Sequence, residues 1–155
     1  MRNKKEKKTV GRREMVDFPE LDLFDIEAKI DTGAYTSAIH CSDIEEEEQP
    51  DGSKAICFKL LDESHPQYNH KQFKFKDYTC RAIKNSFGDV QERYIIRTTI
   101  QLFEEALEAE FSLSDRSDMK YPVLIGRALL QGHFIVDVSR KNVSLKQKQK
   151  KQQQN

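Results

Sequence analysis

The residues of this sequence best suited to chemistry are Asp31, Thr32 and Gly33, which directly follow an alternating apolar run. Two carboxylates about 3 Å apart cannot both ionise, so a pair of aspartates shares one proton and can act as base and acid together. One carboxylate takes a proton from water while the other gives a proton to a carbonyl, and a peptide bond can be hydrolysed without a metal. Asp, Thr and Gly are also ordinary turn residues, so these three letters alone are more typical of a plain loop.

The residues around Asp31 suit such a pair. Gly33 allows the backbone to turn tightly beneath the carboxylate, Thr32 can hydrogen-bond across to a partner loop, and Ala34 keeps the floor small enough for a substrate. The chain contains one Asp-Thr-Gly and no second Asp-Thr-Gly or Asp-Ser-Gly. A catalytic pair therefore requires two chains, each contributing Asp31 across a twofold axis, which predicts a homodimer.

The elements that must position Asp31 are strands, because the apolar residues recur mostly with a period of two. In Leu23–Ile30, every second residue from Phe24 onward is apolar, which predicts a half-buried strand. Further strands are expected at Ala55–Leu61, Gln72–Lys84, Glu92–Leu102, His133–Ser139 and Asn142–Leu145. Clusters of turn-forming residues separate these runs. Many short strands between such turns predict an all-β barrel or sandwich.

Two segments do not follow a simple alternation. Thr99–Phe111 has apolar residues both at helical spacing and at every second position, and propensity slightly favours the helix. Gly126–Gly132 predicts one short helix at Arg127–Gln131. The Arg127 side chain is either exposed to solvent or part of an ion pair that holds the dimer or the Asp31 loop, since its planar fork suits carboxylates.

Charge is distributed unevenly along the 155 residues, which carry 26 basic and 26 acidic side chains. Residues 1–8 and 146–155 each carry a net charge of +4, and the body between them carries −8. Such low-complexity basic ends predict disordered tails at 1–8 and 146–155 around one folded domain at 9–145. The tails could contact nucleic acid or a ribosome by charge, although their composition favours plain disorder.

Composition also predicts the compartment. The sequence has no stretch of 18 apolar residues and no apolar segment behind its basic N-terminal residues, so neither a membrane span nor a secretory signal is expected. The three cysteines, Cys41, Cys57 and Cys80, lack Cys-x-x-Cys spacing, which is typical of reduced thiols. A cytoplasmic protein is therefore predicted.

A zinc-dependent hydrolase is an alternative, and it requires histidines that can act as zinc ligands. Catalytic zinc uses three protein ligands at close spacing, and the His-Glu-x-x-His motif is absent. His40 and Cys41 are adjacent, so on a strand they face opposite sides. His65 and His70 flank a loop segment, and His133 stands alone. No phosphate-binding Gly-x-x-x-x-Gly-Lys-Ser/Thr is present, so we expect neither a metal nor another cofactor.

Several motifs in a fixed order resemble a known family. The segments "AKIDTGAYTSAIH", "GDVQERYIIRT" and "YPVLIGRALLQGHFIVDV" are similar to the bacterial family that carries the label ATP-dependent zinc protease and is grouped with the retropepsin-like aspartic proteases. The resemblance covers roughly Thr9–Lys141. It implies a closed acid-protease β-barrel, a strand at Ala106–Ser114, and an apolar run ending at Gly126 that packs under the Asp31 loop.

The resemblance also implies residue roles. The catalytic residues would be Asp31, Thr32 and Gly33, and the substrate would be a peptide or protein. Cys80–Thr98 would form a hairpin that closes over the substrate. Residues expected to contact the substrate are Ala34, Tyr35, Ser86, Phe87 and Gly88. Tyr35 stands where many members carry a basic residue.

These expectations together predict an aspartic endopeptidase that hydrolyses peptide bonds through water activated by an Asp31 pair. The family resemblance further implies an association with a ligase that adds glutamates to a ribosomal protein, and hence a role in trimming glutamate tags. A non-catalytic binding or scaffold domain on the same barrel remains an alternative, because a fold does not guarantee a function.

Overall fold

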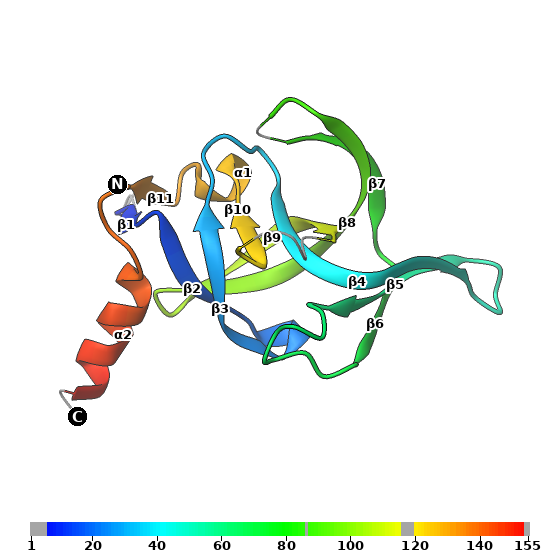
Figure 1. Ribbon diagram of the computed structural model, residues 1–155, viewed down its shortest axis with the longest axis horizontal. Helices are drawn as coiled ribbons and strands as arrows, with labels where there is room; N and C mark the ends of the chain where they lie inside the picture. Colours follow the sequence, from blue (N-terminus) through cyan, green and yellow to red (C-terminus); the bar gives the residue numbers. More distant parts are fainter. Residues whose placement is uncertain (1–5, 86, 116–119, 154–155) are drawn as a thin grey trace, which may run out of the picture.

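The computed structural model describes residues 6–85, 87–115 and 120–153. Figure 1 shows a barrel of strands with a short helix near one end and a longer helix at one side. The strands are β1 Lys8–Val10, β2 Arg13–Phe18, β3 Leu23–Ile30, β4 Ser37–Glu48, β5 Lys54–Leu60, β6 Gln72–Phe75, β7 Thr79–Lys84, β8 Val90–Leu102, β9 Glu105–Ser114, β10 Val123–Ile125 and β11 Phe134–Val136. The helices are α1 Arg127–Leu130 and α2 Val143–Gln153, and a 3₁₀ turn covers Pro19–Leu21.

Among the described residues, six strands close into a ring. β10 pairs in parallel with β3 and antiparallel with β4, and the circuit continues through β2, β8 and β9. β5 and β6 extend the sheet beyond β4, and β7 pairs with β8 in a long hairpin (Figure 1). β1 pairs in parallel with β11 in a separate two-stranded sheet. The predicted closed all-β barrel is confirmed.

The core fills the barrel with residues that alternate along these strands. Ile26, Ala28 and Ile30 of β3 are buried, as predicted, but Phe24 is 48% exposed. Asp25 has a left-handed φ of 52°, and its amide donates to the Asp17 carboxylate at 2.7 Å. This irregularity reverses the alternation before Ile26, so that Leu23 rather than the neighbouring phenylalanine packs inside.

The ambiguous segment Thr99–Phe111 is extended and not helical: it contains the end of β8, a turn at 103–104 and most of β9. β9 pairs with β8 along its whole length, from Glu105 opposite Leu102 to Leu113 opposite Tyr94. Pairing within the sheet therefore overrides the helix propensity of this stretch, because a strand here satisfies the backbone of both neighbours. The expected single strand at Gln72–Lys84 is instead two strands, β6 and β7, which pair with different neighbours.

The short helix α1 is confirmed, and a second helix was not predicted. Asn142–Leu145, expected as a strand, leads into α2 instead, and residues 146–153, expected as part of a disordered tail, continue that helix. Residues 1–5 and 154–155 of the predicted tails lie outside the described residues, and Lys8 already belongs to β1. No helix in the described chain has the length and apolar character needed to span a membrane.

A buried carboxylate explains why α2 starts where it does. Glu14 of β2 is fully buried, and its Oε1 accepts a hydrogen bond from the Ser144 amide at 2.9 Å. Its Oε2 accepts from the Val143 amide at 3.1 Å and from the Gly11 amide at 2.8 Å. The first amides of a helix lack intrahelical partners and favour negative charge, so Glu14 caps α2 from the barrel. Lysine and glutamine then extend the helix with good propensity.

Candidate active site

Asp31 lies at the end of β3, on the loop that leads to β4. One oxygen of its carboxylate, Oδ1, accepts a hydrogen bond from the Gly33 amide at 2.9 Å, and its carbonyl accepts from the Ala34 amide at 3.3 Å. The carboxylate is half-buried and has no ion-pair partner in the described chain. Gly33 is not among the residues with a left-handed φ, so its role in this turn is to donate its amide rather than to adopt a special conformation.

Strand β10 supports the Asp31 loop from below, as predicted. The Asp31 amide donates to the Ile125 carbonyl at 2.8 Å, and the Arg127 amide donates to the Ala34 carbonyl at 2.8 Å. Gly126 lies against the same loop so closely that a Cβ there would be 2.7 Å from the Tyr35 carbonyl oxygen. Only glycine fits this contact without moving the loop.

The Arg127 side chain also holds this loop. Its Nη1 donates to the Thr32 carbonyl at 2.9 Å, and the guanidinium carbon lies 5.8 Å from the centre of the Tyr35 ring. Of the two expectations for Arg127, the structure supports the one in which its side chain holds the Asp31 loop. The side chain does so through a backbone carbonyl and an aromatic ring and not through an ion pair.

The three residues of β10 are all buried, but they do not all face the main core. Val123 and Ile125 are fully buried in the main core. Leu124, 8% exposed, forms a small separate cluster with Ala34 and Ala38. Because side chains alternate along a strand, this residue points to the opposite side and lines the cleft beside Asp31.

A cleft of about 350 Å³ lies between the Asp31 loop and the β7–β8 hairpin. Its lining includes Asp31, Ala34, Leu124 and the hairpin residue Phe87. A second hollow of about 620 Å³ adjoins it through shared hairpin residues and is lined by Gly33, Tyr35, Lys84, Asn85, Phe87, Gly88 and Arg127. The structure therefore brings the expected contact residues Ala34, Tyr35, Phe87 and Gly88 around Asp31. Thr32 contributes its carbonyl to the loop, and Ser86 lies outside the described residues.

The tip of the hairpin is built by Asn85 and Gly88. The Asn85 side-chain oxygen accepts from the amides of Phe87 at 2.9 Å and Asp89 at 3.0 Å, and Gly88 has a φ of 90°, which favours glycine. The Phe87 side chain is 87% exposed. An exposed aromatic ring beside the cleft is available to pack on a bound chain.

Charged residues that no motif identified also line the cleft. Lys29, Lys84 and Arg93 contribute cations from β3 and the hairpin, and Asp89 and Asp115 contribute acids. These residues are far apart in the sequence, so only the strand pairing brings them together. Period-two patterning places each on an exposed face but does not show that the faces share one cleft.

His40, considered above as a zinc ligand, is held by carboxylates instead. It is buried in β4, with Nε2 2.5 Å from Asp62 Oδ2 and Nδ1 3.8 Å from Asp115 Oδ1. Hydrogen bonds from Ser64 and from His40 lower the pKa of Asp62 to about 2. Burial raises the pKa of the neighbouring Cys41 thiol well above its ordinary value. Within the described ranges, no group of three or more His, Cys, Asp or Glu side chains is arranged to hold a metal ion.

Comparison with known proteins identifies the family. Residues 9–147 match the RimB-like family, described as retropepsin-like aspartic endopeptidase RimB. The chain belongs to this family. The resemblance to retropepsin-like proteases is thereby confirmed, and the match does not carry the ATP-dependent zinc protease label. A crystal structure of the Legionella pneumophila protein Lpg0085, of unknown function, has the same fold, with a TM-score of 0.68 and 22% identity over 90% of this chain and 99% of that one.

Curated relatives of the RimB-like chain carry a different name. It is 34% identical over 134 residues to a "Probable alpha-L-glutamate ligase" of Shewanella halifaxensis and 33% identical over 135 residues to one of Desulfotalea psychrophila. The matched regions cover 84% of this chain in both cases. The chain spans only 28% of the length of these relatives, so their name describes longer proteins.

Proposed function

We propose that this chain is an aspartic endopeptidase whose active site forms where two copies bring their Asp31 carboxylates together. One observation carries the proposal. Asp31 ends a barrel strand on a loop held by Gly33, Arg127 and β10, and it lines a cleft whose other wall is a hairpin. Membership of the family supports the reaction class. A single Asp-Thr-Gly supplies half of a two-carboxylate mechanism, which supports the homodimer.

The chemistry follows from one proton shared by two carboxylates. The ionised carboxylate takes a proton from water as the water oxygen bonds to the peptide carbonyl carbon, and the protonated carboxyl gives its proton to the carbonyl oxygen. In the second step the carbon–nitrogen bond breaks. The leaving nitrogen receives a proton from the first carboxyl, and the second carboxylate recovers one from the hydroxyl of the adduct. The Gly33 amide fixes the orientation of Asp31 throughout.

We infer that the preferred substrate is an acidic peptide rich in glutamate. Lys29, Lys84 and Arg93 line the cleft and can pair with carboxylates on either side of the scissile bond. The relatives named as glutamate ligases suggest the source of such a peptide, since a similar region occurs within proteins named for adding glutamate. Trimming of a glutamate-tagged ribosomal protein would fit this chemistry. The three cysteines are free thiols, which suits a cytoplasmic enzyme.

The test compares Asp31→Asn with the wild type and with Asp77→Asn, a matched change at an exposed site outside the cleft. Purified proteins are incubated with a glutamate-rich peptide and with a lysine-rich peptide of equal length, and products are identified by mass spectrometry. We expect the wild type and Asp77→Asn to cleave the glutamate-rich peptide faster, and Asp31→Asn to remain folded and lose all cleavage. An inhibitor that occupies the aspartate pair, such as pepstatin, should block the reaction.

Two outcomes would contradict the proposal at different points. Full activity of Asp31→Asn together with loss of wild-type activity in a chelator would replace the aspartate mechanism with a metal-dependent one. Equal cleavage of both peptides, still dependent on Asp31, would leave the peptidase and reject the acidic preference.

A further inference from the structure

Basic residues from both terminal segments meet on one face of the molecule, away from the Asp31 cleft. A groove of about 600 Å³ runs between the segment at residues 6–9 and helix α2. The cations that line this basic groove are Lys7, Lys8, Arg140, Lys146 and Lys150. In Figure 1, β1, β11 and α2 lie together at the left, and the β7–β8 hairpin lies at the upper right. The basic groove and the cleft share no lining residue.

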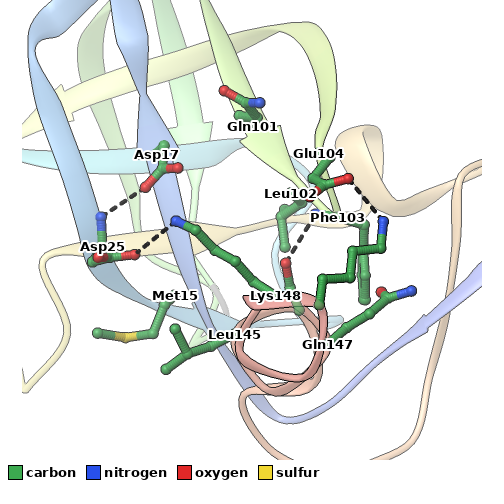
Figure 2. A pocket seen from close by; sticks show the side chains of 12 residues that line it. Met15, Asp17, Asp25, Gln101, Leu102, Phe103, Glu104, Leu145, Gln147 and Lys148 are labelled. Atoms are coloured by element: carbon green, nitrogen blue, oxygen red, sulfur yellow. Dashed lines mark hydrogen bonds and ion pairs between the residues drawn. The ribbon is translucent and has the colours of Figure 1, made fainter. Parts of the chain in front are cut away.

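Helix α2 contacts the barrel, and two of its lysines form ion pairs with it. Lys148 lies 4.0 Å from Asp25 (Figure 2), and Lys151 donates to Glu104 at 2.9 Å. At the start of the helix, the Ser144 hydroxyl oxygen accepts a hydrogen bond from the amide of Phe103, in the turn between β8 and β9, at 2.9 Å. These contacts join helix α2 to the barrel.

The remaining lysines of α2 face the basic groove. Lys146 and Lys150 are four residues apart, which places them on the same side of the helix. Together with Lys7 and Arg140 they give four exposed cations that form no salt bridge within the described chain, although the charge of Arg140 acts on the nearby Asp137 carboxylate. Glu6 is the one acid among the described lining residues. Exposed cations gathered on one face of a chain whose body is acidic give that face a positive potential, which attracts a polyanion.

The lining of the basic groove is suited to binding charged groups and not to stacking with nucleic-acid bases. Its aromatic floor, Phe103, is buried, and the Lys8 ammonium lies 5.3 Å from the centre of that ring. Lys8 also pairs with Glu105 at 3.7 Å, so it is partly neutralised. Lysine binds phosphate as a compact point charge. The exposed glutamines between the lysines of α2 can donate to phosphate and sugar oxygens.

We propose that this basic groove binds the phosphate backbone of nucleic acid without base specificity. The structure brings lysines of the two terminal segments, Lys7, Lys146 and Lys150, together with Arg140 of the body, and Gln147 beside them can donate to the phosphate and sugar oxygens of a nucleic acid. The binding is independent of the proposed peptidase site, so the two can be tested separately. Four phosphate contacts to a single strand would weaken binding about 50-fold between 50 and 200 mM salt, because each contact contributes about 0.7 to the slope of log K against log salt.

The test measures fluorescence anisotropy of a labelled 20-nucleotide RNA, and of DNA with the same sequence, at 50 and 200 mM salt. The test variant Arg140→Gln, Lys146→Gln, Lys150→Gln is compared with Lys54→Gln, Lys71→Gln, Lys76→Gln, which removes the same charge near β5 and β6. We expect wild type and control to bind both strands with the 50-fold salt effect. The test variant, with one free cation left, should bind weakly and change only about threefold.

Three results would overturn the proposal. One is absence of wild-type binding at 50 mM salt. Another is equal loss in the two triple variants, which would show a general effect of net charge. The third is tighter binding to a glutamate-rich peptide, or to vesicles containing phosphatidylserine, than to the RNA, which would assign the groove to an acidic protein or a membrane surface. Circular dichroism confirms that each variant is folded.

Discussion

Replacing Gly126 by alanine tests whether β10 positions the Asp31 loop. The added Cβ would lie 2.7 Å from the Tyr35 carbonyl oxygen and 2.9 Å from the Ala34 carbonyl oxygen, and ordinary contact begins near 3.4 Å. Both atoms belong to the backbone of the Asp31 loop, so neither can rotate away. The loop must move by about 0.7 Å. This movement distorts the hydrogen bonds that the amides of Arg127 and Ala128 donate to the loop carbonyls.

We expect a loss of about 1–3 kcal/mol in the free energy of unfolding, typical of overpacking. Displacement of a catalytic group by about 1 Å can cost 100-fold in rate, so cleavage of the glutamate-rich peptide should fall 10- to 100-fold. Urea unfolding and initial cleavage rates measure the two effects. Gly52→Ala is the control, because Gly52 has a left-handed φ of 85° and open space around it. That variant should lose stability and retain activity.

Gly126→Ala with wild-type stability and wild-type rate would refute the reasoning, because the loop would then tolerate the added atom. Equal loss of activity in both variants would also refute it, since the effect would follow stability and not the position of the loop.

Three further predictions concern the barrel around the site. Glu14→Gln should lower the free energy of unfolding by about 1–3 kcal/mol in urea, because one carboxylate acceptor facing backbone amides becomes a donor; an unchanged midpoint would contradict the cap. The pKa of Asp62 is lowered from 3.8 to about 2, so its contribution to stability is present above pH 3.8 and is lost as the pH falls toward 2. Urea midpoints between pH 5 and 2 should therefore fall less steeply in Asp62→Asn than in the wild type, and parallel curves would reject this. Ile125→Asp should prevent folding, because it buries an unpaired charge, whereas Leu124→Asp should fold and alter peptide cleavage. Equal solubility and equal circular dichroism spectra of the two variants would contradict the placement of the Ile125 side chain in the core and of the Leu124 side chain at the cleft.

The sequence predicts most of the barrel because local patterns decide it. Leu23–Ile30 is a strand over its full predicted range, and the short helix after Gly126 is present. The close approach of Gly126 to the Asp31 loop is also as the family resemblance implied, and the apolar run before it forms a buried strand. These features depend on neighbours in the chain or on one fixed pairing.

The features that the sequence does not predict depend on contacts between distant residues. Helix α2 starts where Glu14, 129 residues earlier, accepts its first free amides, and no local pattern in a Lys- and Gln-rich segment shows that partner. The exposure of Phe24 follows from the irregular backbone at Asp25. Lys29 and Lys84 reach one cleft only through the barrel closure. In each case the cause is tertiary pairing, which periodicity does not encode.

The central claim is that two copies of Asp31 make one active site, and a mixing experiment tests it most directly. Wild-type protein is held at a fixed concentration at which sedimentation shows a dimer, and a threefold excess of Asp31→Asn is allowed to exchange with it. After random pairing, about one wild-type chain in four has a wild-type partner. The rate of cleavage of the glutamate-rich peptide should therefore fall to about a quarter of its value before mixing. Activity that stays unchanged, although exchange is shown by labelled subunits, would mean that each chain acts alone and would contradict the account.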